Sequence, residues 1–464
     1  MLFSTPFFLF VFLPIFLVLY ALLPLRSFVL LLASLIFYGW GEPVFVLVII
    51  ASSALDWWLG RSLPPGSSKH GKKLLIFGVL ANLAMLLYTK YTAFALENLN
   101  LGLSAIGWST ISIPHIALPL GISFIVFEKI TYLVDLHRGK AQPATSFLDY
   151  LNYVFLFPKL LAGPIIKYHD IASQLSKPVH RWDDIHAGLC RFTIGLSKKV
   201  LLSDMLAPTA DAVFKLNPEQ INSPIAWLGL LCFTLQIYFD FSGYSDMAIG
   251  LARMLGFRLL ENFRQPYLAT SITDFWRRWH ISLSTWIKEY LYIPLGGSRV
   301  SPVRAYFNLC LCFFLSGLWH GASWNFIIWG ISHGLLLVID RLFWLRWQQS
   351  LPRGLNVGLT LFLVALTWVF FRCETFPAAQ QFIAALLGGT GEGHHSVIPT
   401  SDVWWALIIG ILGVLLPVFK QAPQWIAALR QRRILCLFGV LVLLLLCTGR
   451  MSVSSLQPFL YFRF

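Results

Sequence analysis

The segment "LSGLWHGASWNFIIWGISHG", residues 315–334, places polar side chains in a run that is otherwise apolar enough to lie in lipid. In it, His320 stands between Trp319 and Gly321, and Asn325 follows a few positions later. A polar ring at membrane depth costs free energy unless it is paired, so such a ring marks a candidate functional site. The segment therefore predicts a membrane protein with a site at His320.

The composition extends this interpretation to the whole chain. Of the 464 residues, 57% are hydrophobic and only 12% are charged, whereas soluble domains carry about 25% charged residues. A perpendicular span needs about 20 residues, and tilt or local thinning accommodates shorter ones. Candidate spans lie near 3–23, 28–40, 44–59, 74–89, 115–136, 225–239, 306–319, 322–340, 355–371, 403–419 and 434–448. We therefore predict an all-α, polytopic helical membrane protein.

The charged residues predict how the spans are oriented, because short cytoplasmic loops are rich in Lys and Arg. Basic loops alternate with loops that carry few basic residues, which places both the N-terminus and the C-terminus outside. The net charge of +14 is explained in the same way, and no nucleic-acid-binding motif accompanies it. Both 158–223 and 258–304 are basic, so we expect 225–255 either to enter the membrane and return or to break the rule. Re-entry would place a protein-lined chamber at the centre of the chain.

Two carboxylates lie in apolar sequence in "IYFDFSGYSDMAIGLARMLGF", residues 237–257. Asp240 and Asp246 must pair, become protonated or meet water there, and Gly243, beside Tyr244, permits a break between them. One interpretation is structural, with Asp246 paired to Arg253 and Asp240 capping a half-helix. The other is functional, with the two carboxylates lining a passage or orienting a histidine.

The next stretch, "SITDFWRRWHISLSTWIKEYLYIPLGG", residues 271–297, has the pattern of an amphipathic helix. Ser271 and Asp274 resemble the start of a capping box. Aromatic and apolar residues recur at helical spacing, which predicts an interfacial helix; they are Trp276, Trp279, Leu283, Trp286, Tyr290 and Ile293. The opposite face carries Arg277 and Arg278 and could meet lipid headgroups or a phosphate-bearing donor. His280 falls at the border of the apolar face, where an interface residue is more common than a catalyst.

Histidine suits acyl transfer because imidazole accepts and releases a proton near pH 7. A hydroxyl that attacks an acyl thioester must lose its proton as the new bond forms. Motifs of serine hydrolases, ATPases and zinc enzymes are absent from the sequence. The seven cysteines lack zinc spacing, so we predict no metal site. A histidine in a passage between two aqueous faces would join a cytoplasmic donor to an external acceptor.

Five blocks of the sequence resemble the membrane-bound O-acyltransferase (MBOAT) family, and in particular its bacterial alginate O-acetylation and D-alanyl transfer subgroup. They occur in family order and cover about half of the chain. They are "LPLGISFIVFEKITYLVDLHRG" (118–139), "FPKLLAGPI" (157–165), "YFDFSGYSDMAIGLARMLGFRLLENFRQPY" (238–267), "FWRRWHISLSTWIKEYLYIPLGG" (275–297) and "LSGLWHGASWNFIIWG" (315–330).

The resemblance implies about eleven transmembrane helices, with re-entrant and interfacial helices, around a central tunnel. It implies that His320 is required for acyl transfer and that His280 is the second tunnel histidine. We expect one membrane domain over 1–464, with N-terminal spans in 1–114, a catalytic core in 115–340 and C-terminal spans in 341–464. We assign the substrate and donor tunnel to Asp240, Tyr244, Asp246, Trp276, Arg277, Arg278, Trp319 and Asn325.

The function that we expect is acetyl transfer at the bacterial inner membrane, from a cytoplasmic thioester to hydroxyls of an exported polysaccharide. His320 would be the general base. The donor would be acetyl-CoA or an acyl carrier, with no bound cofactor, and the expected partners are a periplasmic acetyltransferase or esterase-like protein and membrane lipid. One alternative is D-alanyl or other acyl transfer to a teichoic acid or lipid acceptor. The other is a proton-coupled transporter without enzymatic activity.

Overall fold

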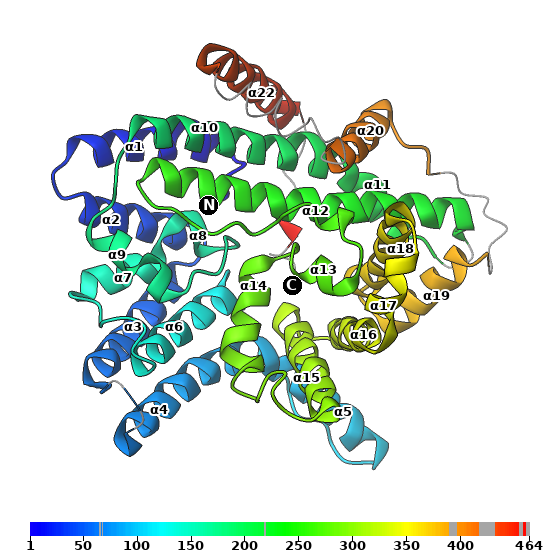
Figure 1. Cartoon of the computed structure of the whole chain (residues 1–464), viewed down its shortest axis with the longest axis horizontal. Coiled ribbons are helices and arrows are strands. Elements are labelled where there is room, and N and C mark those ends of the chain that lie inside the picture. Colours follow the sequence, from blue (N-terminus) through cyan, green and yellow to red (C-terminus); the bar gives the residue numbers. More distant parts are fainter. Residues whose placement is uncertain are drawn as a thin grey trace. The chain divides into compact units, whose positions relative to one another are not determined.

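The computed structural model describes residues 1–64, 66, 68–217, 220–388, 397–416, 432–453 and 458–460. Within these ranges the chain forms helices and connecting loops and no β-strand, which confirms the predicted all-α fold (Figure 1). The helices pack as two compact units. The first unit comprises Met1–Gly188 with Ala248–Leu260, and the second comprises Leu189–Met247 with Glu261–Phe464.

The described part of the chain contains seven helices that are long and apolar enough to cross a membrane. They are Pro43–Ser62, Lys69–Ala105, Ser223–Met254, Pro302–His320, Trp324–Ser350, Arg353–Arg372 and Arg433–Val453. Shorter apolar helices occupy Phe8–Leu22, Arg26–Gly39 and Ser401–Leu415. Each predicted span thus has a helical counterpart, although 115–136 becomes helical only from Ile122. The total of eleven spans and the three-part division of the domain stay predictions.

The first unit begins with η1 (Phe8–Phe12) and α1 (Leu13–Leu22) and is mostly helical. Its further helices are α2 (Arg26–Gly39), α3 (Pro43–Ser62), α4 (Lys69–Leu86), η2 (Leu87–Tyr91), α5 (Thr92–Ala105), α6 (Ile122–His137), α7 (Phe147–Phe155), α8 (Phe157–Leu160) and α9 (Tyr168–Ser176). It also holds the first turns of α10 (Trp182–Ser197) and the last turns of α12 (Ser223–Met254).

Buried charges in the first unit occur as pairs, because an unpaired ion in an apolar interior is very costly. Glu128 on α6 pairs with Lys159 on α8, and both side chains are almost fully buried. Lys129, the next residue on α6, reaches Asp56 on α3 at 3.2 Å. The two pairs tie α6 to elements on both sides of it in the sequence.

The second unit contains the rest of α10 and α12 and the helices that follow them. Before α12 come η3 (Lys198–Ser203) and α11 (Asp204–Phe214). After α12 come η5 (Pro266–Leu268), α13 (Ile272–Trp276), α14 (Ile281–Ile287), η6 (Lys288–Tyr292), α15 (Pro302–His320), α16 (Trp324–Ile339), η7 (Asp340–Trp344), α17 (Leu345–Trp347), η8 (Gln348–Ser350), α18 (Arg353–Arg372), α19 (Phe376–Leu386), α20 (Ser401–Leu415) and α22 (Arg433–Val453).

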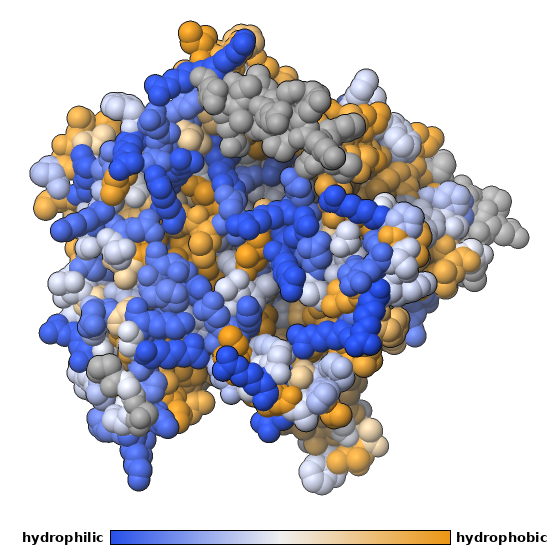
Figure 2. All heavy atoms as spheres, in the orientation of Figure 1, coloured by the Kyte–Doolittle hydropathy of each residue, from blue (hydrophilic) through white to orange (hydrophobic). Residues whose placement is uncertain are grey.

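Surface hydropathy agrees with helices that meet both water and lipid. Figure 2 shows hydrophilic side chains over α7 and α9 and hydrophobic side chains over α20. Seven large apolar residues of α20 are exposed: Trp404, Trp405, Ile408, Ile409, Ile411, Leu412 and Leu415. Such a surface is stable in lipid but would aggregate in water.

The break that Gly243 would permit does not occur, because α12 runs without interruption from Ser223 to Met254. Its 32 residues correspond to about 48 Å at 1.5 Å per residue, which is longer than the ~30 Å hydrocarbon core. Re-entry of 225–255 is therefore wrong as well. Gly243 serves instead for close packing, since a Cβ there would lie 2.8 Å from the carbonyl oxygen of Gly195 on α10.

The predicted single helix over 271–297 is also wrong. Ser271 does cap a helix, accepting the N–H of Asp274 at 3.0 Å, but that helix ends after Trp276. A turn over 277–280 follows before α14 begins at Ile281. Trp276, Trp279 and Trp286 are at most 8% exposed, so they form protein core and do not face the headgroup zone. Helical periodicity could not reveal the turn, because both halves keep apolar residues on their packed side.

Candidate active site

His280 lies in an unusual backbone conformation at the end of this turn. Its φ of 43° is in the left-handed region. Among the described residues other than glycine, Gln265 also has a positive φ. This conformation costs a side-chain-bearing residue about 1–2 kcal/mol, and such strain clusters at functional sites. Two backbone hydrogen bonds hold it: Arg264 N–H to Arg278 O and Ile281 N–H to Asn262 O, both at 2.9 Å.

Asn262 fixes the protonation of the His280 ring. The Nδ1 atom of His280 lies 3.2 Å from Asn262 Oδ1, and the N–H and hydroxyl of Ser282 donate to the same oxygen. The amide nitrogen of Asn262 donates to Ser245 Oγ at 3.1 Å, which identifies Oδ1 as the acceptor. Nδ1 of His280 therefore carries the hydrogen, and Nε2 carries the basic lone pair of the neutral ring.

Burial keeps the His280 ring neutral. The residue is 0% exposed, and desolvation lowers its pKa to about 3. Loss of water disfavours the charged imidazolium, so the ring is unprotonated at neutral pH. A neutral imidazole with a fixed tautomer can receive a proton at Nε2.

His320 is the last residue of α15, and its ring is packed between aromatic side chains. The ring centroids of Trp329 and Phe371 lie 4.9 and 5.3 Å away, both at steep angles. Gly321 then continues in extended backbone and ends the helix. His320 is 4% exposed, so its ring is as fully enclosed by other side chains as that of a core residue.

The ring of Trp319 contacts the rings of both His280 and His320. Its ring centroid lies 6.0 Å from that of His280 and 4.9 Å from that of His320. Helices α13, α14, α15, α16 and α18 lie in the same part of Figure 1, and α15 packs tightly on α16. The sequence predicted both histidines and Trp319, and the structure brings all three together.

Asp240 is a partner in a buried ion-pair network. Lys199 donates to its Oδ1 at 2.6 Å, and the N–H of Leu460 donates to its Oδ2 at 2.8 Å. Lys199 also reaches Asp204 at 2.8 Å. Asp240 lies within the uninterrupted α12, so the interpretation that it caps a half-helix is wrong.

Asp246 has partners other than the one that the sequence suggested. It accepts from Arg191 at 2.8 Å and from Lys198 at 2.6 Å, and Arg191 also pairs with Glu261. The proposed pair with Arg253 is wrong, because Arg253 binds Asp184 instead. Asp246 is therefore paired with cations, as the structural interpretation proposed, but its partners are Arg191 and Lys198.

Of the residues near Asp240 on α12, Phe241 is the one whose ring contacts a site histidine. Its centroid lies 4.6 Å from that of His280, with the rings perpendicular. Tyr244, one turn further along, is buried, and its ring centroid lies 4.9 Å from that of Phe459 with the rings tilted. Sequence reasoning missed Phe241 and Asn262, although Asn262 directly precedes "FRQPY" (263–267) in one of the family-like blocks.

The remaining predicted site residues occupy different surroundings. Trp276 donates through Nε1 to Nδ1 of His333 at 3.2 Å, and Nε2 of His333 meets Thr367 at 2.9 Å, so His333 has a structural role. Asn325 donates to the carbonyl of Cys373 at 2.6 Å. Arg278 pairs with Asp274 at 2.8 Å, and Arg277 is exposed. A tunnel lined by these residues stays a prediction.

The long apolar helices define an integral membrane protein, and its class follows from a comparison with known families. The model of the membrane-bound O-acyltransferase family matches residues 135–371, about half of the chain, and the chain belongs to this family. This assignment favours an enzyme over the transporter considered above.

Several known proteins are similar to the chain. The probable alginate O-acetylase AlgI of Azotobacter vinelandii is 38% identical over the full length of both chains. The peptidoglycan O-acetyltransferase of Helicobacter pylori is 37% identical over 84% of this chain and 80% of its own length. The teichoic acid D-alanyltransferase of Bacillus subtilis is 27% identical over 54% of this chain and 66% of its own length.

Proposed function

We propose that this protein transfers acetyl groups from a cytoplasmic thioester to hydroxyls of an exported polysaccharide. The names of the full-length and near-full-length relatives, an alginate O-acetylase and a peptidoglycan O-acetyltransferase, support acetyl as the acyl group and a glycan as the acceptor. The observation that carries the proposal is the pair of buried imidazoles in contact with one tryptophan, Trp319.

In the proposed step, His320 takes the proton of the acceptor hydroxyl as its oxygen attacks the thioester carbonyl. The C–S bond then breaks, and the departing thiolate receives the proton. His280, held neutral with Nε2 basic, assists this transfer or positions the thioester. The acceptor is the polysaccharide itself or a periplasmic esterase-like partner that relays the acetyl group. Acetyl-CoA and an acyl carrier protein both fit as donors.

The test replaces His320 by Ala in the full-length chain and quantifies acetyl esters on the exported polysaccharide by mass spectrometry. General base catalysis contributes about 10²–10⁴-fold, so the ester content should fall at least 100-fold. His70→Ala, at an exposed histidine on α4, is the matched control and should leave acetylation unchanged. Normal acetylation by a stably inserted His320→Ala protein would reject the proposal.

The same mass spectra decide the nature of the acyl group. The likeness to a D-alanyltransferase, although it covers only about half of this chain, makes D-alanyl transfer the second candidate. An alanyl ester without acetyl would replace acetyl transfer by this candidate. We further propose an inner-membrane location with both termini periplasmic, which cysteine labelling of each terminus in intact cells would check.

A further inference from the structure

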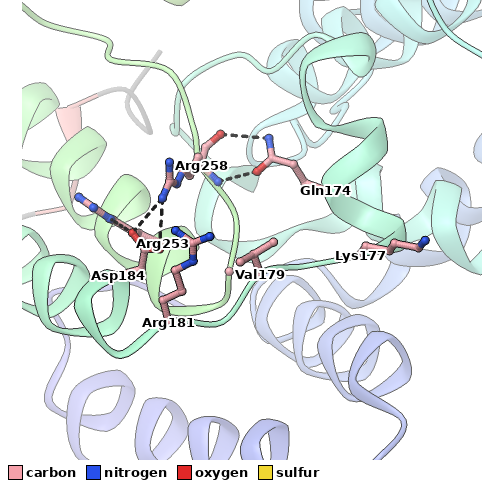
Figure 3. Close-up of a pocket in the computed structure, with 8 residues that line it drawn as sticks. Gln174, Lys177, Val179, Arg181, Asp184, Arg253 and Arg258 are labelled. Carbon is pink, nitrogen blue, oxygen red and sulfur yellow. Dashed lines mark hydrogen bonds and ion pairs between the residues drawn. The ribbon is translucent and has the colours of Figure 1, made fainter.

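Two adjoining pockets in the first unit have no role in the proposed transfer. One, of about 330 Å³, is lined by four basic residues, Lys177, Arg181, Arg253 and Arg258, and by Asp184. The other, of about 430 Å³, is mostly apolar. Arg181 lines both pockets, so they share a boundary. Figure 3 shows the side chains of Arg181, Arg253 and Arg258 gathered around Asp184.

Asp184 organises the cationic pocket. Its side chain is 8% exposed and accepts from Arg253 Nε at 2.9 Å and from Arg258 Nη2 at 3.3 Å. The hydrogen bond from Arg253 lowers the pKa of Asp184, so the carboxylate stays ionised at neutral pH. One carboxylate cannot neutralise four cations, and guanidinium groups keep further donors for an anion.

The loops around the cationic pocket are held in place by hydrogen bonds of their own. Arg258 N–H donates to Gln174 Oε1 at 2.7 Å, and Gln174 Nε2 donates to Arg258 O at 3.3 Å. Val179 N–H donates to Gly256 O at 3.3 Å. Gly256 has a φ of 88°, and a Cβ there would lie 2.8 Å from His180 Nδ1. The pocket is therefore preformed.

The second pocket has the character of a lipid-chain site. Leu17 and Ala21 of the apolar helix Phe8–Leu22 line it, together with Ile185 and Met254. Trp182 also lines it and is 83% exposed. An exposed tryptophan beside the end of an apolar helix is typical of the membrane interface. Arg26 and Arg181 place positive charge at the same site.

We propose that the two pockets together bind one anionic phospholipid, with its phosphate among the guanidinium groups and an acyl chain against α1. A soluble phosphate would satisfy the cationic pocket alone and leave the apolar pocket without an occupant. A neutral lipid would satisfy the apolar pocket and leave the excess positive charge unmatched. An anionic phospholipid complements both pockets. This proposal goes beyond the proposed acyl transfer, because the bound lipid is neither the donor nor the acceptor of the acyl group.

The test measures phosphatidylglycerol bound to the full-length protein in detergent by native mass spectrometry, with phosphatidylcholine as the competitor. Arg181→Gln combined with Lys177→Gln removes two cations that form no ion pair among the described residues. Each basic side chain near an anionic lipid is worth about fivefold in affinity, so binding should weaken about 30-fold. Lys72→Gln with Arg304→Gln, two exposed cations elsewhere, is the matched control and should bind as the unchanged chain does.

A second variant separates the lipid from a soluble anion. Ala21→Phe fills the apolar pocket from an exposed position without changing charge, and it should weaken phosphatidylglycerol binding while pyrophosphate binding is unaffected. Equal binding of phosphatidylcholine and phosphatidylglycerol would overturn the proposal. So would pyrophosphate binding without a bound lipid, since the pocket would then take a soluble phosphorylated ligand.

Discussion

At the scale of single residues, the chemistry of His280 depends on a neighbour that is not itself ionisable. Asn262 holds Nδ1–H and leaves Nε2 as the base. Its own amide is fixed by Ser245, so a chain of neutral hydrogen bonds defines the tautomer. Asn262 is thus a positioning residue, and its effect should be visible in the pH dependence of the reaction.

Asn262→Asp should move the acid limb of the pH–rate profile to higher pH. Burial lowers the pKa of His280 to about 3, so the unchanged ring stays a base throughout the working range. A carboxylate at 262 stabilises the imidazolium and raises this pKa, so the neutral base is lost at a higher pH as the pH falls. Initial rates of acetyl transfer in proteoliposomes between pH 4 and 9 measure the shift.

The control for this experiment is Asn217→Asp, which makes the same change at an exposed position. Its profile should coincide with that of the unchanged protein. If Asn262→Asp lowers the rate equally at every pH, the asparagine does not act through the protonation of His280.

At the scale of elements, glycine pairs decide how closely the helices pack. In the second unit, α10 and α12 meet where Gly195 and Gly243 face each other's carbonyl oxygens. The hairpin of α15 and α16 uses the same device, since a Cβ on Gly317 would lie 2.2 Å from the carbonyl oxygen of Phe326. Small residues at helix contacts allow this close approach in membranes, and here they position His320 at the end of α15.

Gly243→Ala should destabilise the protein, because its Cβ would lie 2.8 Å from a backbone oxygen that cannot yield. Overpacking of this kind costs about 1–3 kcal/mol, which should lower the midpoint of thermal unfolding in detergent by several degrees. Gly358→Ala on α18, where a Cβ would meet nothing within 4 Å, should leave the midpoint unchanged or raise it. Equal midpoints for the two variants would contradict this account of α12.

At the scale of the whole molecule, buried charges link segments that are distant in sequence. Asp240 joins Lys199, 41 positions away, and Leu460, 220 positions away. Removing one member of a buried pair leaves the other charge uncompensated, which costs about 3–5 kcal/mol. This network gives the buried Asp240 a structural role.

Lys199→Met and Asp240→Asn should therefore each destabilise the protein, and the double variant should lose less than the sum of the two. Unfolding midpoints of the four proteins complete the cycle. The specific activity of folded Asp240→Asn should stay within about threefold of the unchanged protein, since general base catalysis supplies far more. A loss near that of His320→Ala, with normal stability, would make Asp240 part of the reaction.

The sequence by itself determined that the chain is a helical membrane protein, since hydropathy is a local property that each span carries in its own residues. It also singled out His320, His280 and Trp319, because polar and aromatic residues in a family-like motif can be recognised without coordinates. The turn over 277–280 and the course of α12 were decided by the tertiary structure. Asn262, the partners of Asp246 and the lipid pocket depend in the same way on contacts between distant segments. Which cation reaches which carboxylate is set by helix packing, and spacing along the chain does not contain that information.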